Sequence, residues 1–237
     1  MQTTAIVTGG TKGIGFGIAH AVLSGGGRVM ITGRDTSGVA EAVGRLTAGL
    51  DDPSRVAGLA SDVRDRQSVE AVVRETVERF GGFNVLVNNA GVGMFADVRE
   101  MTDDDWSRVI DTNLTGVFYC CRAALPHLKR AGSSWIINIA SLAGRNFLPK
   151  GAAYCASKAG LVAFSESLML DVRADGVRVS VIMPGSVDTD FGAPSAPGAD
   201  NSWKLAPDDI GEVVMDLLRQ PSRSLPSKIE IRPARTR

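Results

Sequence analysis

Short apolar runs alternate with longer amphipathic stretches along the chain, and this alternation most limits the folds it can adopt. The strand-like runs lie at residues 5–8, 28–32, 56–60, 85–87, 136–139, 177–182 and 229–231. Helical patterns fill most of the gaps, at 14–24, 36–48, 67–80, 103–128, 152–174 and 207–219. Several strands are apolar throughout, as strands buried on both faces should be. The pattern predicts an α/β fold in one domain over residues 1–237, with a doubly wound, seven-stranded, mainly parallel sheet and helices on both faces.

The charge balance, the cysteine spacing and the hydropathy of the chain limit which partners and which compartment we expect. The 26 basic and 26 acidic residues cancel, so we expect neither nucleic acid nor an anionic membrane as a partner. Cys120, Cys121 and Cys155 have neither disulfide nor metal-site spacing, and reduced thiols are typical of a cytoplasmic protein. No apolar run approaches the roughly 18 residues of a membrane span. A strand beginning near residue 5 leaves no room for a signal peptide.

A glycine-rich segment follows the first strand and opens the first helix. It reads Thr8-Gly9-Gly10-Thr11-Lys12-Gly13-Ile14-Gly15. Its glycines permit a tight turn and close approach of the backbone to a phosphate, and the free N–H groups at the helix start favour an anion. A glycine-rich turn without a ligand is the alternative, but the position between first strand and first helix favours a bound dinucleotide.

The end of the second strand distinguishes NADP from NAD. Gly33 stands where an NAD enzyme would carry a carboxylate, and Arg34 offers a planar fork for a phosphate. Lys12 adds a second cation. We therefore expect NADP(H), with NAD(H) as the weaker alternative. Asp35 is expected to cap the next helix, although an NAD-type contact stays open.

Tyr154 and Lys158 lie four residues apart in a predicted helix, so their side chains share one face. A cation beside a phenol favours the phenolate, so we expect Lys158 to lower the pKa of Tyr154 toward the working range. Taken alone, the pair is also compatible with a packed ring and a snorkelling amine.

Together these residues resemble the short-chain dehydrogenase/reductase family, with its Rossmann-type fold, over nearly the whole chain. The glycine loop, Asp62-Val63, Asn88-Asn89-Ala90-Gly91, and Pro184-Gly185 with Thr189 match its cofactor motifs in order. Asn113, Ser141, Tyr154 and Lys158 match its catalytic tetrad. The resemblance assigns cofactor binding to Gly9, Thr11, Lys12, Gly13, Ile14, Gly15, Arg34, Asp62, Val63, Asn89, Ala90, Gly91, Tyr154, Lys158, Pro184, Gly185, Val187 and Thr189.

The resemblance implies a carbonyl reductase in which a nicotinamide gives hydride and Tyr154 gives the proton. Ser141 would stabilise the developing oxyanion, Lys158 would also bind the nicotinamide ribose, and Asn113 would hold a water that links Lys158 to solvent. Each residue has a plainer alternative. Asn113 could bond to backbone, Ser141 could cap a helix, and Asn88-Asn89 could form a turn.

Residues 185–205 have no periodicity and are expected to form a substrate loop. The expected pocket is largely apolar and suits a ketone or aldehyde with a hydrophobic part. Arg145 could pair with an acidic substrate group, although a solvated side chain is the safer expectation. The residues expected to line the pocket are Gly93, Met94, Phe95, Leu142, Arg145, Asn146, Phe147, Phe191 and Trp203.

The end of the chain departs from the family pattern. It reads Lys228-Ile229-Glu230-Ile231-Arg232-Pro233 and lacks the Asp-Gly-Gly stretch that many relatives, including the 3-oxoacyl thioester reductases, use in subunit packing. That argues against a role in fatty-acid synthesis and makes a homodimer as plausible as a homotetramer. Two alternatives stay open: an NAD-dependent alcohol dehydrogenase of the same family, and a non-catalytic NADPH-binding regulator.

Overall fold

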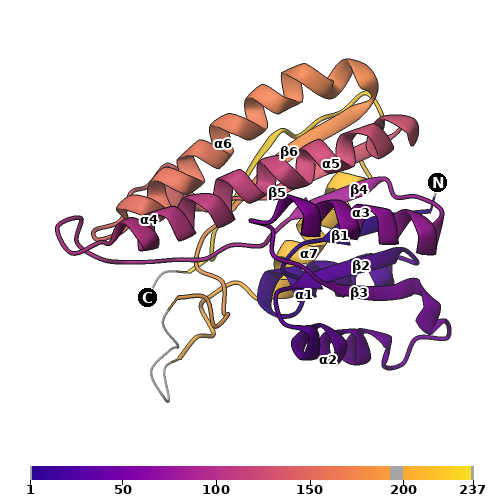
Figure 1. The fold of residues 1–237 in the computed structure, drawn as a ribbon, viewed down its shortest axis with the longest axis horizontal. Coiled ribbons are helices and arrows are strands. Elements are labelled where there is room, and N and C mark those ends of the chain that lie inside the picture. The colour runs from indigo at the N-terminus through magenta and orange to yellow at the C-terminus, as the bar shows by residue number, and fades with distance from the viewer. Residues whose placement is uncertain (1, 193–199, 236–237) are drawn as a thin grey trace.

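Seven parallel strands form one twisted sheet in the computed structural model, which describes residues 2–192 and 200–235 (Figure 1). In chain order they are β1 Thr4–Val7, β2 Arg28–Gly33, β3 Val56–Ala60, β4 Val85–Asn88, β5 Ser134–Ile139, β6 Val177–Pro184 and β7 Lys228–Ile231. Their order in the sheet is β3-β2-β1-β4-β5-β6-β7, and every neighbouring pair is parallel. The predicted doubly wound fold is confirmed.

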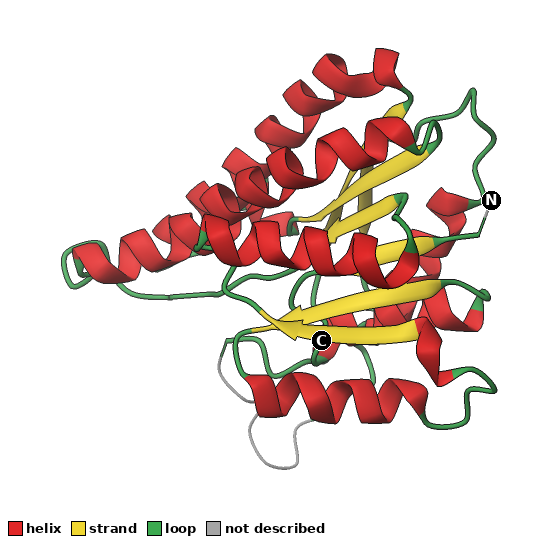
Figure 2. Ribbon diagram, turned by 45° about the vertical axis from the view of Figure 1, so that its right-hand side comes forward, coloured by secondary structure: helices red, strands yellow, loops and turns green. Residues whose placement is uncertain are grey.

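Helices cover both faces of the sheet (Figure 2). On one side lie α3 Arg66–Phe80, α5 Gly116–Arg130 and α6 Ala152–Val172, with α4 Asp103–Ile110 packed against α6. On the other lie α1 Gly13–Ser24, α2 Thr36–Thr47 and α7 Pro207–Leu218. Each layer has its own core: Ile136 and Leu161 are buried in the first, Ile18 and Ile137 in the second. Neighbouring residues of β5 therefore pack into the cores on opposite faces of the sheet, which explains the uninterrupted apolar runs.

The predicted single helix over 103–128 is wrong in one respect. A π-helical turn, Asp111–Thr115, separates α4 from α5, and the Gly116 N–H bonds to the Asp111 carbonyl. Asn113 lies in this wider turn, and its side chain bonds to backbone outside the helix. Apolar spacing cannot reveal one inserted residue, which is why the sequence pattern missed a feature that often marks functional positions.

Parallel strands place all their carboxyl ends at one edge of the sheet. The glycine loop, Asn89, Ser141 and Gly185 follow β1, β4, β5 and β6 at this edge, where ligands bind in open α/β sheets. The order of the strands reverses between β1 and β4, so the glycine loop and Asn89 are neighbours. No helix among the described residues is long and apolar enough to cross a membrane.

Candidate active site

The glycine loop is held against the end of β4 by Thr8 and Asn89. The Thr8 hydroxyl accepts hydrogen bonds from the Asn89 and Ala90 N–H groups at 3.0 and 3.1 Å. Asn89 Nδ2 donates to the carbonyls of Thr8 and Gly9 at 3.0 and 2.9 Å. A Cβ on Gly15 would collide with the Gly9 carbonyl oxygen and with this amide, so only glycine fits there. The Asn89 side chain therefore points at the glycine loop and holds its backbone through these two hydrogen bonds.

Helix α1 begins without a side-chain cap. Its N-cap residue, Lys12, makes no side-chain hydrogen bond to the first turn, whereas Asp35, Asp65 and Thr102 cap α2, α3 and α4. The first-turn N–H groups of α1 are therefore left to an external acceptor, and the helix dipole favours an anionic one. This is the arrangement that a bound pyrophosphate requires.

At the end of β2, Arg34 is exposed and forms no ion pair with any described residue. Asp35 accepts hydrogen bonds from the Gly38 N–H and the Ser37 hydroxyl, both at 2.7 Å, which lower its pKa. The expectation that Asp35 caps α2 is confirmed. Lys12 lies 3.7 Å from Asp190 of the 185–205 loop, so Arg34 is the cation free to meet a ribose phosphate.

Arg45 contacts the glycine loop from α2 and was missed in the sequence. Its Nη2 donates to the Thr11 carbonyl at 2.7 Å, and its guanidinium lies 4.4 Å from the Phe16 ring centroid. Nothing in the local sequence signals this role, because the contact joins residues 34 positions apart.

Asp62 and Val63 follow β3 with different surroundings. The Asp62 carboxylate pairs with Arg64 at 2.6 Å, and that hydrogen bond holds the Asp62 pKa below its usual range. The Val63 side chain is buried in the core, close to Gly116 at the start of α5. Only the backbone of Val63 is therefore placed to meet a ligand.

Tyr154, Ser157 and Lys158 are buried on the first turns of α6 at the carboxyl edge. Lys158 Nζ donates to the Ile139 carbonyl at 2.8 Å and lies 5.8 Å from the centroid of the Tyr154 ring. Burial lowers the pKa of Lys158 to about 8. The ammonium also lies near Gly91, since a Cβ there would be 3.7 Å from Nζ.

The pKa of Tyr154 is raised, so the expected lowering by Lys158 is wrong for this structure. Burial is the largest cause of the rise, a hydrogen bond with Ser141 opposes it, and Cys155 adds to it. The Lys158 ammonium donates to the Ile139 carbonyl. The phenol therefore stays protonated at neutral pH.

Ser141 follows β5 and performs the capping role that was its plainer alternative. Its Oγ accepts a hydrogen bond from the Ala143 N–H at 3.1 Å, at the start of the short turn Leu142–Gly144. A Cβ on Gly144 would lie 2.9 Å from the Lys158 carbonyl, so glycine lets this turn pack closely on α6. Because Oγ accepts from backbone, its own proton can be donated, and the hydrogen bond with Tyr154 directs it toward the phenol oxygen.

The Asn113 side chain is fully buried and bonded to protein. Its Oδ1 accepts from the Val92 N–H at 2.8 Å, and its Nδ2 donates to the Val92 carbonyl at 2.9 Å and to Ser157 Oγ at 3.0 Å. Ser157 in turn donates to the Tyr154 carbonyl at 2.8 Å. Ser157 was missed in the sequence, and its place beside Lys158 was the available signal. The side chain follows the backbone-bonded alternative, and the water-holding role of Asn113 stays a prediction.

Two aromatic rings flank Tyr154. The centroids of Phe95 and Phe191 lie 5.5 and 5.7 Å from that of Tyr154, and both side chains are exposed. A Cβ on Gly93 would touch both rings, so the three predicted pocket residues lie together. Phe147 is exposed near the end of β5, and Trp203 is half-buried in the second part of the loop.

The Arg145 side chain is 59% exposed, which agrees with the expected solvated side chain, and pairing with a substrate group stays a prediction. Its Nη1 pairs with Glu230 of β7 at 2.7 Å, and Arg232 lies 2.9 Å from the same carboxylate. The pair ties the segment after Ser141 to the final strand.

The 185–205 loop begins at Gly185, whose N–H bonds to the Ile231 carbonyl, and its ends pair through Val187 and Leu205. Thr189 lies over the glycine loop, since a Cβ on Gly13 would be 3.2 Å from Thr189 Cγ2. The middle of the loop, 193–199, lies outside the described residues. No group of three His, Cys, Asp or Glu that could hold a metal occurs within 2–192 and 200–235.

Comparison with known proteins agrees with this geometry. The model of the short chain dehydrogenase family matches residues 3–199. An uncharacterized oxidoreductase of Staphylococcus saprophyticus is 36% identical over 97% of this chain and 96% of its own length. A 3-oxoacyl-[acyl-carrier-protein] reductase of Haemophilus influenzae is 39% identical over 79% of this chain and 75% of its own.

Solved structures match over almost the whole chain. An alcohol dehydrogenase from the archaeon Thermococcus sibiricus, complexed with 5-hydroxy-NADP, superposes with a TM-score of 0.90 at 28% identity and covers 100% of this chain and 99% of its own. A metagenomic short-chain oxidoreductase in complex with NADP gives 0.84 at 33% identity, covering 99% of this chain and 98% of its own.

Proposed function

Because the chain belongs to the short-chain dehydrogenase family of NAD(P)-dependent oxidoreductases, we propose that it reduces a ketone or aldehyde to an alcohol with NADPH. The observation that carries this proposal is a protonated, buried phenol beside a serine hydroxyl at the carboxyl edge of the sheet. A protonated phenol at this position can give its proton to a carbonyl oxygen. The reaction is reversible, and in alcohol oxidation the same residue would act as the base.

The cofactor site fits a dinucleotide with a 2′-phosphate. The uncapped first turn of α1 would bind the pyrophosphate, and Arg34 would bind the 2′-phosphate. The two solved relatives complexed with NADP or its derivative support this choice. When bound, NADPH supplies the hydride.

Tyr154 gives its proton to the substrate oxygen. Ser141 donates a second hydrogen bond to that oxygen and stabilises its negative charge as it develops. Lys158, buried and anchored on the Ile139 carbonyl, is positioned to reach a ribose hydroxyl. Asn113 fixes the backbone of Val92 against α6 through Ser157, which keeps the tyrosine in place.

The substrate carries an apolar group beside its carbonyl. Phe95 and Phe191 offer exposed rings on two sides of Tyr154, and such rings favour flat or aliphatic groups over charged ones. Arg145 pairs with Glu230 at the surface, so it would have to exchange this partner to bind a substrate carboxylate.

A 3-oxoacyl thioester is a second candidate substrate, favoured by similarity to the Haemophilus reductase. An NAD-dependent alcohol dehydrogenase is disfavoured because Asp35 already caps α2.

We also infer self-association into a homodimer or homotetramer in the cytoplasm. Trp106, Phe118 and Leu170, on α4, α5 and α6, are exposed by 44%, 42% and 57%, and apolar side chains of this size favour burial against another surface. Light scattering coupled to gel filtration measures the state, and a monomer at micromolar concentration would contradict the inference.

The test is a panel of aryl ketones, aliphatic aldehydes and a 3-oxoacyl thioester, assayed by NADPH consumption. Turnover of the aryl ketones supports the proposal, turnover of the thioester alone favours the second candidate, and no turnover contradicts both. The cofactor is tested separately by binding NADPH and NADH to the wild type and to Arg34→Ala. We expect NADPH affinity to fall about 10- to 100-fold with NADH unchanged. Equal affinities in the wild type, unmoved by the substitution, would refute the NADP assignment.

A further inference from the structure

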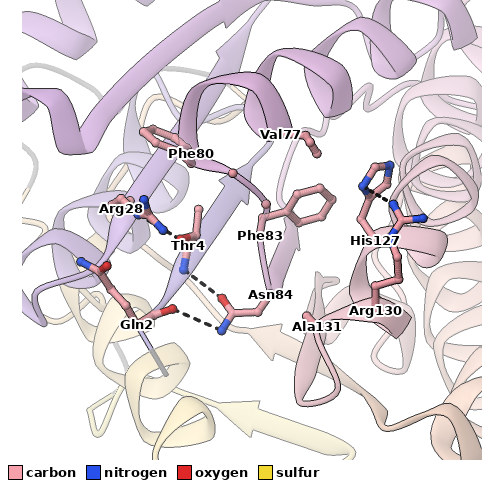
Figure 3. Close-up of a pocket in the computed structure, with 12 residues that line it drawn as sticks. Gln2, Thr4, Arg28, Val77, Phe80, Phe83, Asn84, His127, Arg130 and Ala131 are labelled. Carbon is pink, nitrogen blue, oxygen red and sulfur yellow. Dashed lines mark hydrogen bonds between the residues drawn. The ribbon is translucent and has the colours of Figure 1, made fainter.

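A cavity of about 340 Å³ opens at the amino edge of the sheet, the edge opposite Tyr154 (Figure 3). The starts of β1, β2 and β4 and the ends of α3 and α5 form its walls. This volume lies at the lower end of the range for pockets that hold small organic molecules. No residue of the proposed active site lines it.

The charged groups that line this cavity are basic. Arg28 and Arg130 contribute guanidinium groups, and none of the described lining residues is acidic. Arg28 Nε donates to Thr4 Oγ1 at 3.2 Å, and Arg130 Nη2 lies 2.8 Å from His127 Nδ1. Neither arginine forms an ion pair within the described part of the chain. Each guanidinium is thus held in place by a neutral partner and keeps N–H groups for a further acceptor.

The ends of the two helices account for only one of these cations. Cations favour helix C-termini, and Arg130 lies in the last turn of α5. Arg28 lies on β2, and its guanidinium is 5.5 Å from the Phe80 ring centroid rather than on a helix carbonyl.

The remaining wall is aromatic. The Phe83 ring stacks on His127 with centroids 5.6 Å apart and an interplanar angle of 25°. In the close-up, Phe83 lies between Arg28 on one side and the His127–Arg130 pair on the other. Phe83 and Phe80 are 4% and 7% exposed, so only small parts of their rings line the cavity between the two cations. Such a site is suited to a molecule that joins a small apolar group to an anionic end.

We propose that this cavity binds a small organic anion, a carboxylate or phosphate ester attached to a small apolar group. The Arg28 guanidinium would bind the anion, and Arg130, on the other side of Phe83, would attract it electrostatically. The parts of Phe80 and Phe83 that line the cavity would contact its apolar group. The inference does not depend on the proposed function, because no residue is shared between the two sites.

The test uses the full, isotope-labelled chain with its cofactor site saturated by NADP⁺, titrated with four probes and followed by amide NMR shifts. The probes are phenyl phosphate, benzoate, inorganic phosphate and benzyl alcohol. We expect phenyl phosphate or benzoate to shift the amides of residues 81–84 and 127–131, and benzyl alcohol to leave them unmoved. The comparison of phenyl phosphate with benzoate identifies which anion is preferred.

Two variants and a control decide the outcome. Arg28→Gln should weaken binding by about tenfold or more, and Arg130→Gln, which changes an exposed side chain, covers the case in which Arg28→Gln fails to fold. Arg74→Gln, an exposed α3 arginine outside the cavity, should have no effect. Shifts confined to residues 9–15, shifts at the cavity that neither variant weakens, or no shifts at all would overturn the proposal.

Discussion

Replacing Lys158 by Met removes a cation that the fold keeps almost entirely from water. The lysine is 4% exposed, and burial lowers its pKa from 10.5 to about 8. Because its pKa is lower in the folded state, the native protein binds fewer protons than the unfolded chain between about pH 8 and 10.5. The free energy of unfolding therefore rises with pH across this window. The stabilisation that comes from having Lys158 neutral in the folded state is fully present above about pH 10.5 and is lost as the pH falls through about 8.

The pKa difference corresponds to about 3 kcal/mol in total, of which about 2.5 kcal/mol falls between pH 7 and pH 10. Ionisable groups that are not in contact with Lys158 contribute equally to wild type and Lys158→Met, so they cancel in the difference between the two proteins. Urea denaturation followed by tryptophan fluorescence measures both stabilities at several pH values. We expect the stability of wild type relative to Lys158→Met to increase by about 2.5 kcal/mol from pH 7 to pH 10. A difference that does not change with pH would refute the reasoning, because it would mean that the ammonium is as well hydrated in the native state as in the unfolded chain.

Three further predictions follow from the packing. Gly15→Ala should abolish cofactor binding, measured by calorimetry, because the added methyl group collides with the glycine loop. Gly44→Ala is the control, since Gly44 in α2 has open space around it, and this change should leave binding unchanged. Asn138→Ala should cost about 2–4 kcal/mol in chemical denaturation, because it removes the acceptor that Asn88 Nδ2 meets at 2.8 Å in the core, and a loss below about 0.5 kcal/mol would contradict this. Phe191→Ala should raise KM several-fold for an aryl ketone while changing it little for a small aliphatic ketone, and equal effects on both would argue against an apolar wall.

Sequence reasoning recovered the fold because its signals are local and repeated. Each of the seven strands begins within two residues of the expected position, since buried parallel strands leave continuous apolar runs. The π-helical turn at Asn113 was not predictable in the same way. The Asn113 side chain in this turn makes two hydrogen bonds to Val92, a residue 21 positions earlier, and such a contact leaves no mark on periodicity.

The sequence predicted which residues form the candidate site better than it predicted their hydrogen-bond partners and pKa values. The helical spacing of Tyr154 and Lys158 correctly placed both on one face of α6. It did not show that Lys158 would bond to the Ile139 carbonyl, nor that burial would raise the pKa of Tyr154. Desolvation depends on the whole fold around a group, so one helix cannot reveal it. The same holds for Arg145, whose partner on β7 lies 85 residues away.

Tyr154→Phe tests the central claim most directly. The change removes only the phenol oxygen, so the ring should still pack between Phe95 and Phe191. NADPH binding by calorimetry and carbonyl turnover by NADPH consumption are measured on the same preparation. We predict that turnover falls by at least about 10³-fold while the NADPH dissociation constant changes less than about threefold. Turnover within about tenfold of wild type would show that another group delivers the proton, and would contradict the account.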